Sequence, residues 1–102
     1  MSWKCSFCES FNSDEKIICE VCDSISPFLA KFNYEYIGNN KAVIEWQAEN
    51  ARKVIACFNS KKYDITNWKA ARISLNEALS LVSIFVINEV TERTYTFGIP
   101  KI

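Results

Sequence analysis

The chain has 102 residues, of which 49% are apolar and 14% aromatic, and it contains only two glycines and two prolines. This composition excludes an intrinsically disordered chain, and the length allows one ordinary domain or a small domain with a shorter module. Lysines plus arginines equal aspartates plus glutamates at 12 each, so the charge of the whole chain points neither to nucleic acid nor to a membrane surface.

The first residues contain neither a basic stretch nor a long apolar run, so they do not read as a signal peptide. The longest apolar run, between residues 79 and 87, is too short to cross a bilayer. We therefore expect a cytoplasmic protein without a membrane segment, whose thiols stay reduced. In that compartment, paired cysteines favour a bound metal over disulfides.

Most of the chemistry in the sequence lies in two Cys-x-x-Cys pairs, which are separated by ten residues: Cys5, Cys8, Cys19 and Cys22. Each pair can turn two thiolates toward one ion, and two pairs complete the tetrahedral shell that Zn²⁺ prefers. A segment this short cannot bury enough apolar surface to fold alone, so metal binding must supply its folding free energy, on the order of 10 kcal/mol. The spacing predicts one structural zinc ion with no open position for catalysis.

The residues around the cysteines follow the pattern W-x-C-x2-C-x3-N-x6-C-x2-C, in which the tryptophan is Trp3 and the asparagine is Asn12. This pattern resembles the Ran-binding-protein type zinc finger, a small zinc-ribbon-like module, and the resemblance covers residues 1–26. We expect Trp3 to pack beneath the metal and shield it from water. The side chain of Asn12 can hydrogen-bond the backbone of the turn that links the two cysteine pairs.

Members of that family that bind single-stranded RNA carry an aromatic residue directly after the asparagine and two arginines further along the turn. The corresponding positions here hold Ser13, Glu15 and Lys16, so base stacking and the readout of guanine edges are both lost. Residues 1–26 also carry two basic and five acidic side chains, and this net charge of −3 repels a phosphate backbone. The sequence therefore disfavours nucleic acid as the partner, and RNA binding stays an alternative.

Members that bind ubiquitin place a threonine and an aromatic residue directly after the second cysteine and a hydrophobic residue between the third and fourth. Here Glu9 and Ser10 follow Cys8, whereas Val21 fits the hydrophobic position. Ubiquitin binding is therefore a second alternative that matches only half of the family's binding surface.

The other apolar residues of the module have two interpretations. The one that we favour assigns four of them to a small core of the module: Phe7, Phe11, Ile17 and Ile18. If they are exposed instead, the candidate contacts for a protein partner are Phe7, Phe11 and Val21. A third hypothesis is a thiol-based redox or zinc sensor, which predicts zinc release under mild oxidants.

Pro27 restricts the residue before it to extended geometry and marks a boundary. Beyond it, alternating and β-branched patterns predict strands at 31–37, 42–48, 54–59, 72–75, 81–90 and 94–99. The segment 54–59 is apolar on both faces, which predicts a central strand, and 81–90 is apolar enough to be buried. Pro100 suits an edge strand. A short helix between 66 and 80 is the alternative, because Ser74 and Glu77 fit a capping box.

Six or seven short strands with polar turns between them predict an antiparallel β-sandwich. The segment 43–51 and the last two strands resemble immunoglobulin-like domains of bacterial multidomain proteins. We therefore expect a small zinc-ribbon-like finger at residues 1–26, followed by an all-β, immunoglobulin-like antiparallel sandwich at residues 28–102. The pattern leaves open whether the finger docks on the sandwich or moves freely.

The sequence offers little for catalysis. It contains no histidine, and its two glycines cannot build a phosphate-binding loop. We expect Cys57 to be a small buried residue on a central strand and Trp46 to lie in the core, whereas Trp68 is the better surface candidate. The sequence predicts a non-catalytic zinc-binding protein that mediates protein–protein contact.

Overall fold

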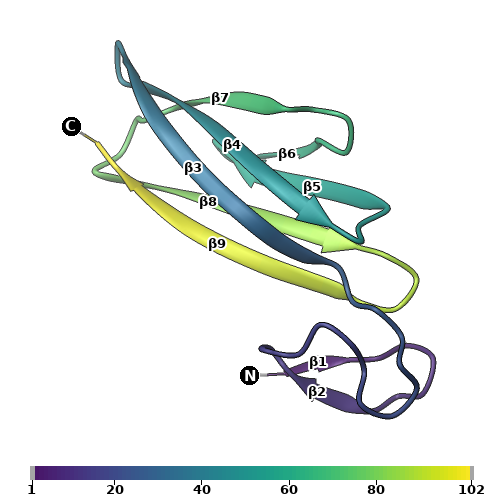
Figure 1. Ribbon diagram of the computed structural model, residues 1–102. Coiled ribbons are helices and arrows are strands. Elements are labelled where there is room, and N and C mark those ends of the chain that lie inside the picture. Colours follow the sequence, from purple (N-terminus) through teal and green to yellow (C-terminus); the bar gives the residue numbers. More distant parts are fainter. Residues whose placement is uncertain (1, 102) are drawn as a thin grey trace.

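The computed structural model describes residues 2–101, and within that range it contains nine β-strands and no helix. Two short strands, β1 (Ser2–Lys4) and β2 (Phe11–Ser13), pair antiparallel in an N-terminal module that also holds four cysteines. The other seven strands, β3 to β9, form two antiparallel sheets (Figure 1). The predicted fold class, a cysteine module followed by an all-β antiparallel sandwich, is confirmed.

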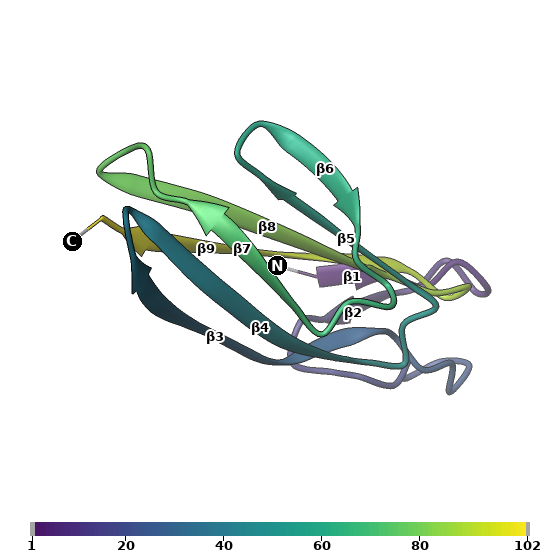
Figure 2. The ribbon, with the colours of Figure 1, turned by 90° about the horizontal axis from the view of Figure 1, so that it is seen from above.

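The two sheets face each other, as the view from above shows (Figure 2). The smaller sheet has the strand order β3 (Phe28–Gly38), β4 (Lys41–Glu49), β7 (Ala70–Ser74). The larger sheet has the strand order β6 (Lys61–Asp64), β5 (Lys53–Phe58), β8 (Leu79–Ile87), β9 (Glu92–Pro100). This is an immunoglobulin-like arrangement in which β6 pairs with β5 in the larger sheet and not with β7 in the smaller sheet.

The core lies between the sheets because every second residue of the inner strands points inward. Its buried members include Ala42, Ile44, Val54, Ala56, Ile73, Val82, Ile84 and Val86. The expectation that the whole apolar run 81–90 is buried is wrong for one face of β8, on which Leu81 is 60% exposed and Phe85 and Ile87 are only half-buried. The other face of the larger sheet has no second layer over it, so only alternate residues of β8 reach the core.

Contacts between the two sheets close the sandwich on both sides. On one side, the rings of Phe32 in β3 and Phe97 in β9 stack with their centroids 3.9 Å apart. On the other side, Asn59 Nδ2 donates to the Ser74 carbonyl at 2.8 Å, and Asn59 Oδ1 accepts from the Ser74 amide at 3.0 Å. The prediction that the last strand lies at an edge is confirmed, because β9 has only β8 beside it in its sheet.

Two local expectations need correction. The sequence predicts no strand between residues 59 and 72, but Asn59 and Ser60 adopt positive φ angles of 51° and 63° and reverse the chain in two residues, so that β6 begins at Lys61. The alternative of a helix between 66 and 80 is wrong, because Ala70–Ser74 forms β7. There the period-two burial of Ala71 and Ile73 against the core outweighs local helix propensity.

Candidate metal centre

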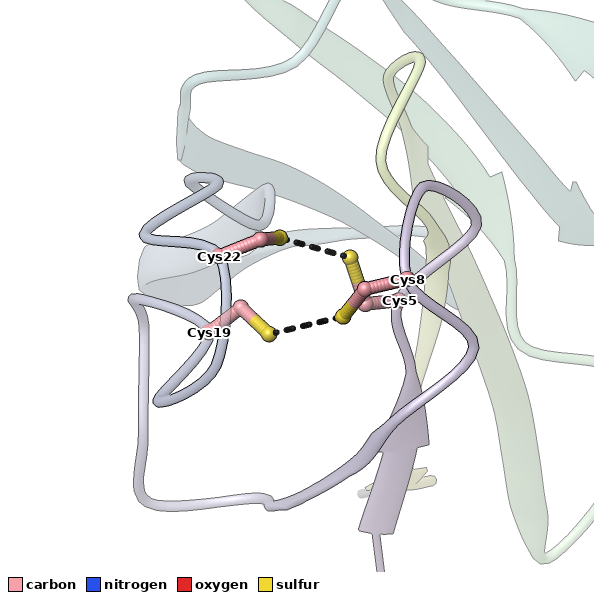
Figure 3. Close-up of side chains that lie close together, drawn as sticks. All are labelled: Cys5, Cys8, Cys19 and Cys22. Carbon is pink, nitrogen blue, oxygen red and sulfur yellow. Dashed lines mark hydrogen bonds between the residues drawn. The ribbon is translucent and has the colours of Figure 1, made fainter.

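The four N-terminal cysteines converge on one point. Their Sγ atoms all lie within 4.8 Å of one another, and two pairs, Cys5 with Cys22 and Cys8 with Cys19, are each 3.5 Å apart (Figure 3). Disulfide sulfurs lie about 2 Å apart, whereas four sulfurs at about 2.3 Å from one tetrahedral ion lie roughly 3.8 Å from each other. The separations between the four sulfur atoms therefore suit one tetrahedral ion and are too long for disulfides.

The two cysteine turns are copies of one another, offset by 14 residues: Lys-Cys-Ser-Phe-Cys-Glu-Ser-Phe at 4–11 and Ile-Cys-Glu-Val-Cys-Asp-Ser-Ile at 18–25. In both turns, the amide of the first cysteine donates to the carbonyl five residues later, at 2.9 Å and 2.8 Å. The residue after the second cysteine is left-handed in both, with φ angles of 61° at Glu9 and 60° at Asp23. This repeat is a sequence signal that the prediction from cysteine spacing missed.

Backbone dipoles prepare Cys19 for metal binding. Hydrogen bonding from the backbone of Cys22 lowers the pKa of the Cys19 thiol to about 6; the Asn12 side chain and the backbone of Val21 act in the same direction, whereas burial opposes them. Metal ligands must be thiolates, so this arrangement favours the ionisation state that a cation requires.

Trp3 packs against the cysteines as the sequence predicts, whereas Asn12 bonds the second cysteine turn and not the segment that links the two turns. Trp3 is 4% exposed and packs with Cys5 and Cys19, and its Nε1 donates to the Lys16 carbonyl at 2.8 Å. Asn12 Oδ1 accepts a hydrogen bond of 3.0 Å from the amide of Glu20 in the second turn. Asn12 Nδ2 is buried, and it acts on the Cys19 thiol, whose pKa it lowers, without reaching ideal hydrogen-bond geometry with any described residue.

The module is docked on the end of the sandwich, at the turn between β8 and β9 (Figure 1). Val90 in that turn is 4% exposed and packs into the cluster formed by Trp3 and the cysteines. The Ser6 amide donates to the Val90 carbonyl at 2.7 Å, and Asn88 Nδ2 donates to the Ile25 carbonyl at 3.0 Å. The sequence left open whether the finger docks on the sandwich or moves freely. These contacts show that it docks, because they link both cysteine turns to the sandwich.

A second contact lies on the other side of the module. Arg93 at the start of β9 donates through Nη2 to the Asp14 carbonyl at 2.6 Å, and its side chain is only 10% exposed.

Asn88 also stabilises the docking turn between β8 and β9, because its Oδ1 accepts hydrogen bonds from the amides of Val90 and Thr91 at 2.8 Å and 3.1 Å. The conformation of the docking turn is therefore stabilised by hydrogen bonds within the sandwich itself.

The candidate partner contacts are exposed: Phe7 by 62%, Phe11 by 71% and Val21 by 68%. The favoured interpretation of Phe7, Phe11, Ile17 and Ile18 as a small core is wrong, because Trp3, the buried cysteines and Val90 fill the interior of the module. Ile18 and Ile25, at 51% and 47% exposure, belong to the same exposed set and were not among the predicted contacts. The role of these residues in partner binding stays a prediction.

The remaining singled-out residues lie in the sandwich. Cys57 is half-buried on β5, opposite Lys62 and Ser83 and away from the core residues of that strand. Trp46 is half-buried and packs against the core, and Trp68 is 45% exposed. None of the three lies near the cysteine cluster in the contacts of the described residues.

No protein-family model, curated protein or solved structure matches this chain. Within residues 2–101, no helix is long and apolar enough to cross a membrane. The function is therefore argued from the chemistry of the cysteine cluster and of the surface around it.

Proposed function

We propose that this chain is a non-catalytic zinc protein of the cytoplasm that binds another protein through a finger of the Ran-binding type. The observation that carries this proposal is the combination of a four-sulfur cluster with exposed apolar side chains. Of the eleven large apolar side chains exposed in the described part of the chain, six lie between residues 7 and 25. The sandwich, which we relate to the immunoglobulin-like domains of bacterial proteins, then serves as the base on which the finger is held.

Zinc is the ion that the sulfur set favours. A tetrahedral set of four soft thiolates suits either Zn²⁺ or an iron–sulfur centre. The absorption spectrum of the purified chain distinguishes these two cases, because a zinc site is colourless and an iron–sulfur site is coloured. Four protein ligands fill the coordination sphere of zinc, so no position remains for a water molecule or a substrate. This argues for a structural ion and against an enzyme.

A protein partner suits the surface better than RNA does. Exposed apolar side chains gathered on one small module are typical of a site that another protein covers. Residues 1–26 carry a net charge of −3, and four thiolates on one Zn²⁺ add about two further negative charges. That field repels a phosphate backbone, on which most affinity for nucleic acid depends.

The proposal is tested in a pull-down from lysate with four baits, of which three carry zinc and one is metal-free. Bound proteins and bound RNA are both identified. The baits are the intact chain, Cys19→Ser/Cys22→Ser to remove the metal, Phe7→Ser/Val21→Ser to remove exposed apolar side chains, and Leu81→Ser as a control on the sandwich. We expect one set of proteins to be retained by the intact chain and the control and lost from the other two. Identical sets on all four baits, or RNA as the retained species, contradict the proposal.

A further inference from the structure

The two cysteine turns repeat one another, but their surroundings differ. The amide of Ser6 in the first turn is bonded to Val90 of the sandwich, whereas the equivalent amide of Glu20 in the second turn is bonded inside the module, to Asn12. The first cysteines of the two turns, Cys5 and Cys19, are both buried, but the second cysteines differ, because Cys22 is exposed and Cys8 is half-buried. The metal cluster is thus open to solvent on the side of the second turn.

The second turn also carries three exposed aliphatic side chains, those of Ile18, Val21 and Ile25. Ile18 and Ile25 face each other across an isolated antiparallel bridge, which brings their side chains together, and they are 51% and 47% exposed. Val21, at the tip of the same turn, is 68% exposed. In the first turn the equivalent pair is Lys4 with Phe11, which interrupts the apolar surface with a charge.

The charge around this aliphatic surface is negative. Between residues 17 and 25 the only ionisable side chains besides the cysteines are Glu20 and Asp23, and both are exposed. In the first turn, residues 4–11, Lys4 balances Glu9. Lys16 lies 3.3 Å from Glu20, but both side chains are more than half exposed, so water screens that pair. The exposed Cys22 sulfur, as a thiolate on the metal, adds to the negative rim.

We propose that this second-turn surface, formed by Ile18, Val21 and Ile25 with the rim of Glu20, Asp23 and Cys22, binds a short segment of a partner protein that carries an apolar side chain flanked by lysines or arginines. The apolar side chain covers the isoleucine pair and Val21 and removes them from water. The flanking cations lie against the two carboxylates and the Cys22 thiolate, and this complementarity excludes acidic segments. The inference rests on the proposed function, since it names the chemistry of the partner of that finger.

The test uses a library of random 12-residue peptides displayed on phage and selected on the zinc-loaded full chain. We expect selected sequences to place Leu, Ile, Val or Phe next to Lys or Arg. The strongest peptide, made synthetically, is then titrated into the chain and its Kd measured by fluorescence anisotropy. Val21→Ser/Ile25→Ser should weaken it at least about tenfold, and added salt should weaken it further.

Two exposed leucines of the sandwich supply a matched control, Leu79→Ser/Leu81→Ser, which removes aliphatic side chains of similar exposure outside the finger. It should change the Kd less than about threefold, and metal analysis of both variants confirms that the finger is still loaded. If Phe7→Ser/Phe11→Ser in the first turn abolishes peptide binding and the second-turn variant does not, the inference is wrong while the proposed function stands. Acidic selected peptides also overturn the inference, and a selection that enriches nothing on the zinc-loaded chain overturns both.

Discussion

Replacing Val90 with alanine removes the side chain by which the sandwich enters the apolar cluster of the metal module. Val90 is 4% exposed, so the change takes two methyl groups out of a packed site between Trp3 and the buried cysteines. Losing two buried methyl groups costs about 1.5–2.5 kcal/mol. On the proposal that the module folds only with a bound zinc ion, this loss falls on the docked, metal-bound state, and we expect the apparent zinc affinity to fall about tenfold or more.

The assay is a competitive zinc titration against a colorimetric chelator, with the stability of the metal-free sandwich followed separately by urea unfolding. Val86→Ala is the matched control, because Val86 lies four residues earlier and is fully buried in the sandwich core. The control should lower the urea midpoint of the sandwich and leave the zinc affinity unchanged, and Val90→Ala should do the reverse. Equal zinc affinities in Val90→Ala and the unaltered chain would refute the claim that docking stabilises the metal-bound module.

Three further predictions follow from individual contacts. Asn12→Ala removes the acceptor of the Glu20 amide, so zinc affinity measured by the same titration should fall about fivefold, the equivalent of about 1 kcal/mol; an unchanged affinity contradicts this role. Asp64 accepts hydrogen bonds from the side chain and the amide of Thr66, which lower the pKa of its carboxyl below the ordinary 3.8. The stabilisation that this carboxylate contributes is fully present above the pKa of the unfolded state and is lost as the pH falls through the pKa of the folded state. Asp64→Asn should therefore lower the urea midpoint at pH 7 and have a smaller effect at pH 3. Equal effects at both pH values contradict this prediction. Stripping the metal with a strong chelator should shift the fluorescence of Trp3, seen in a Trp46→Phe/Trp68→Phe background, and leave the far-ultraviolet signal of the sandwich in place.

The cysteine cluster and most strands could be predicted from the sequence because the signals that specify them are local. Two Cys-x-x-Cys turns place four thiolates by spacing alone, and the alternation in β4 and β9 repeats every two residues. The short strand β6 was missed because it has only four residues and begins with two lysines, which read as a turn. In a strand at the edge of a sheet, lysines are well suited to solvent.

The docking of the module could not be predicted, because the residues that form it are far apart in the chain. Asn88 and Ile25 are separated by 63 positions, and nothing in either segment indicates the other. The assignment of Phe7 and Phe11 to a core failed for a related reason. Val90, from the sandwich, fills the interior that the finger sequence alone would have to fill, so the phenylalanines stay on the surface.

The most direct test of the central claim is the metal content and coordination of the purified chain, measured by elemental analysis and zinc X-ray absorption. The account predicts one zinc per chain, coordinated by four sulfurs at about 2.3 Å, and its loss in Cys19→Ser/Cys22→Ser. A shell that contains oxygen, or a metal-free chain whose four cysteines are paired as disulfides, would contradict it.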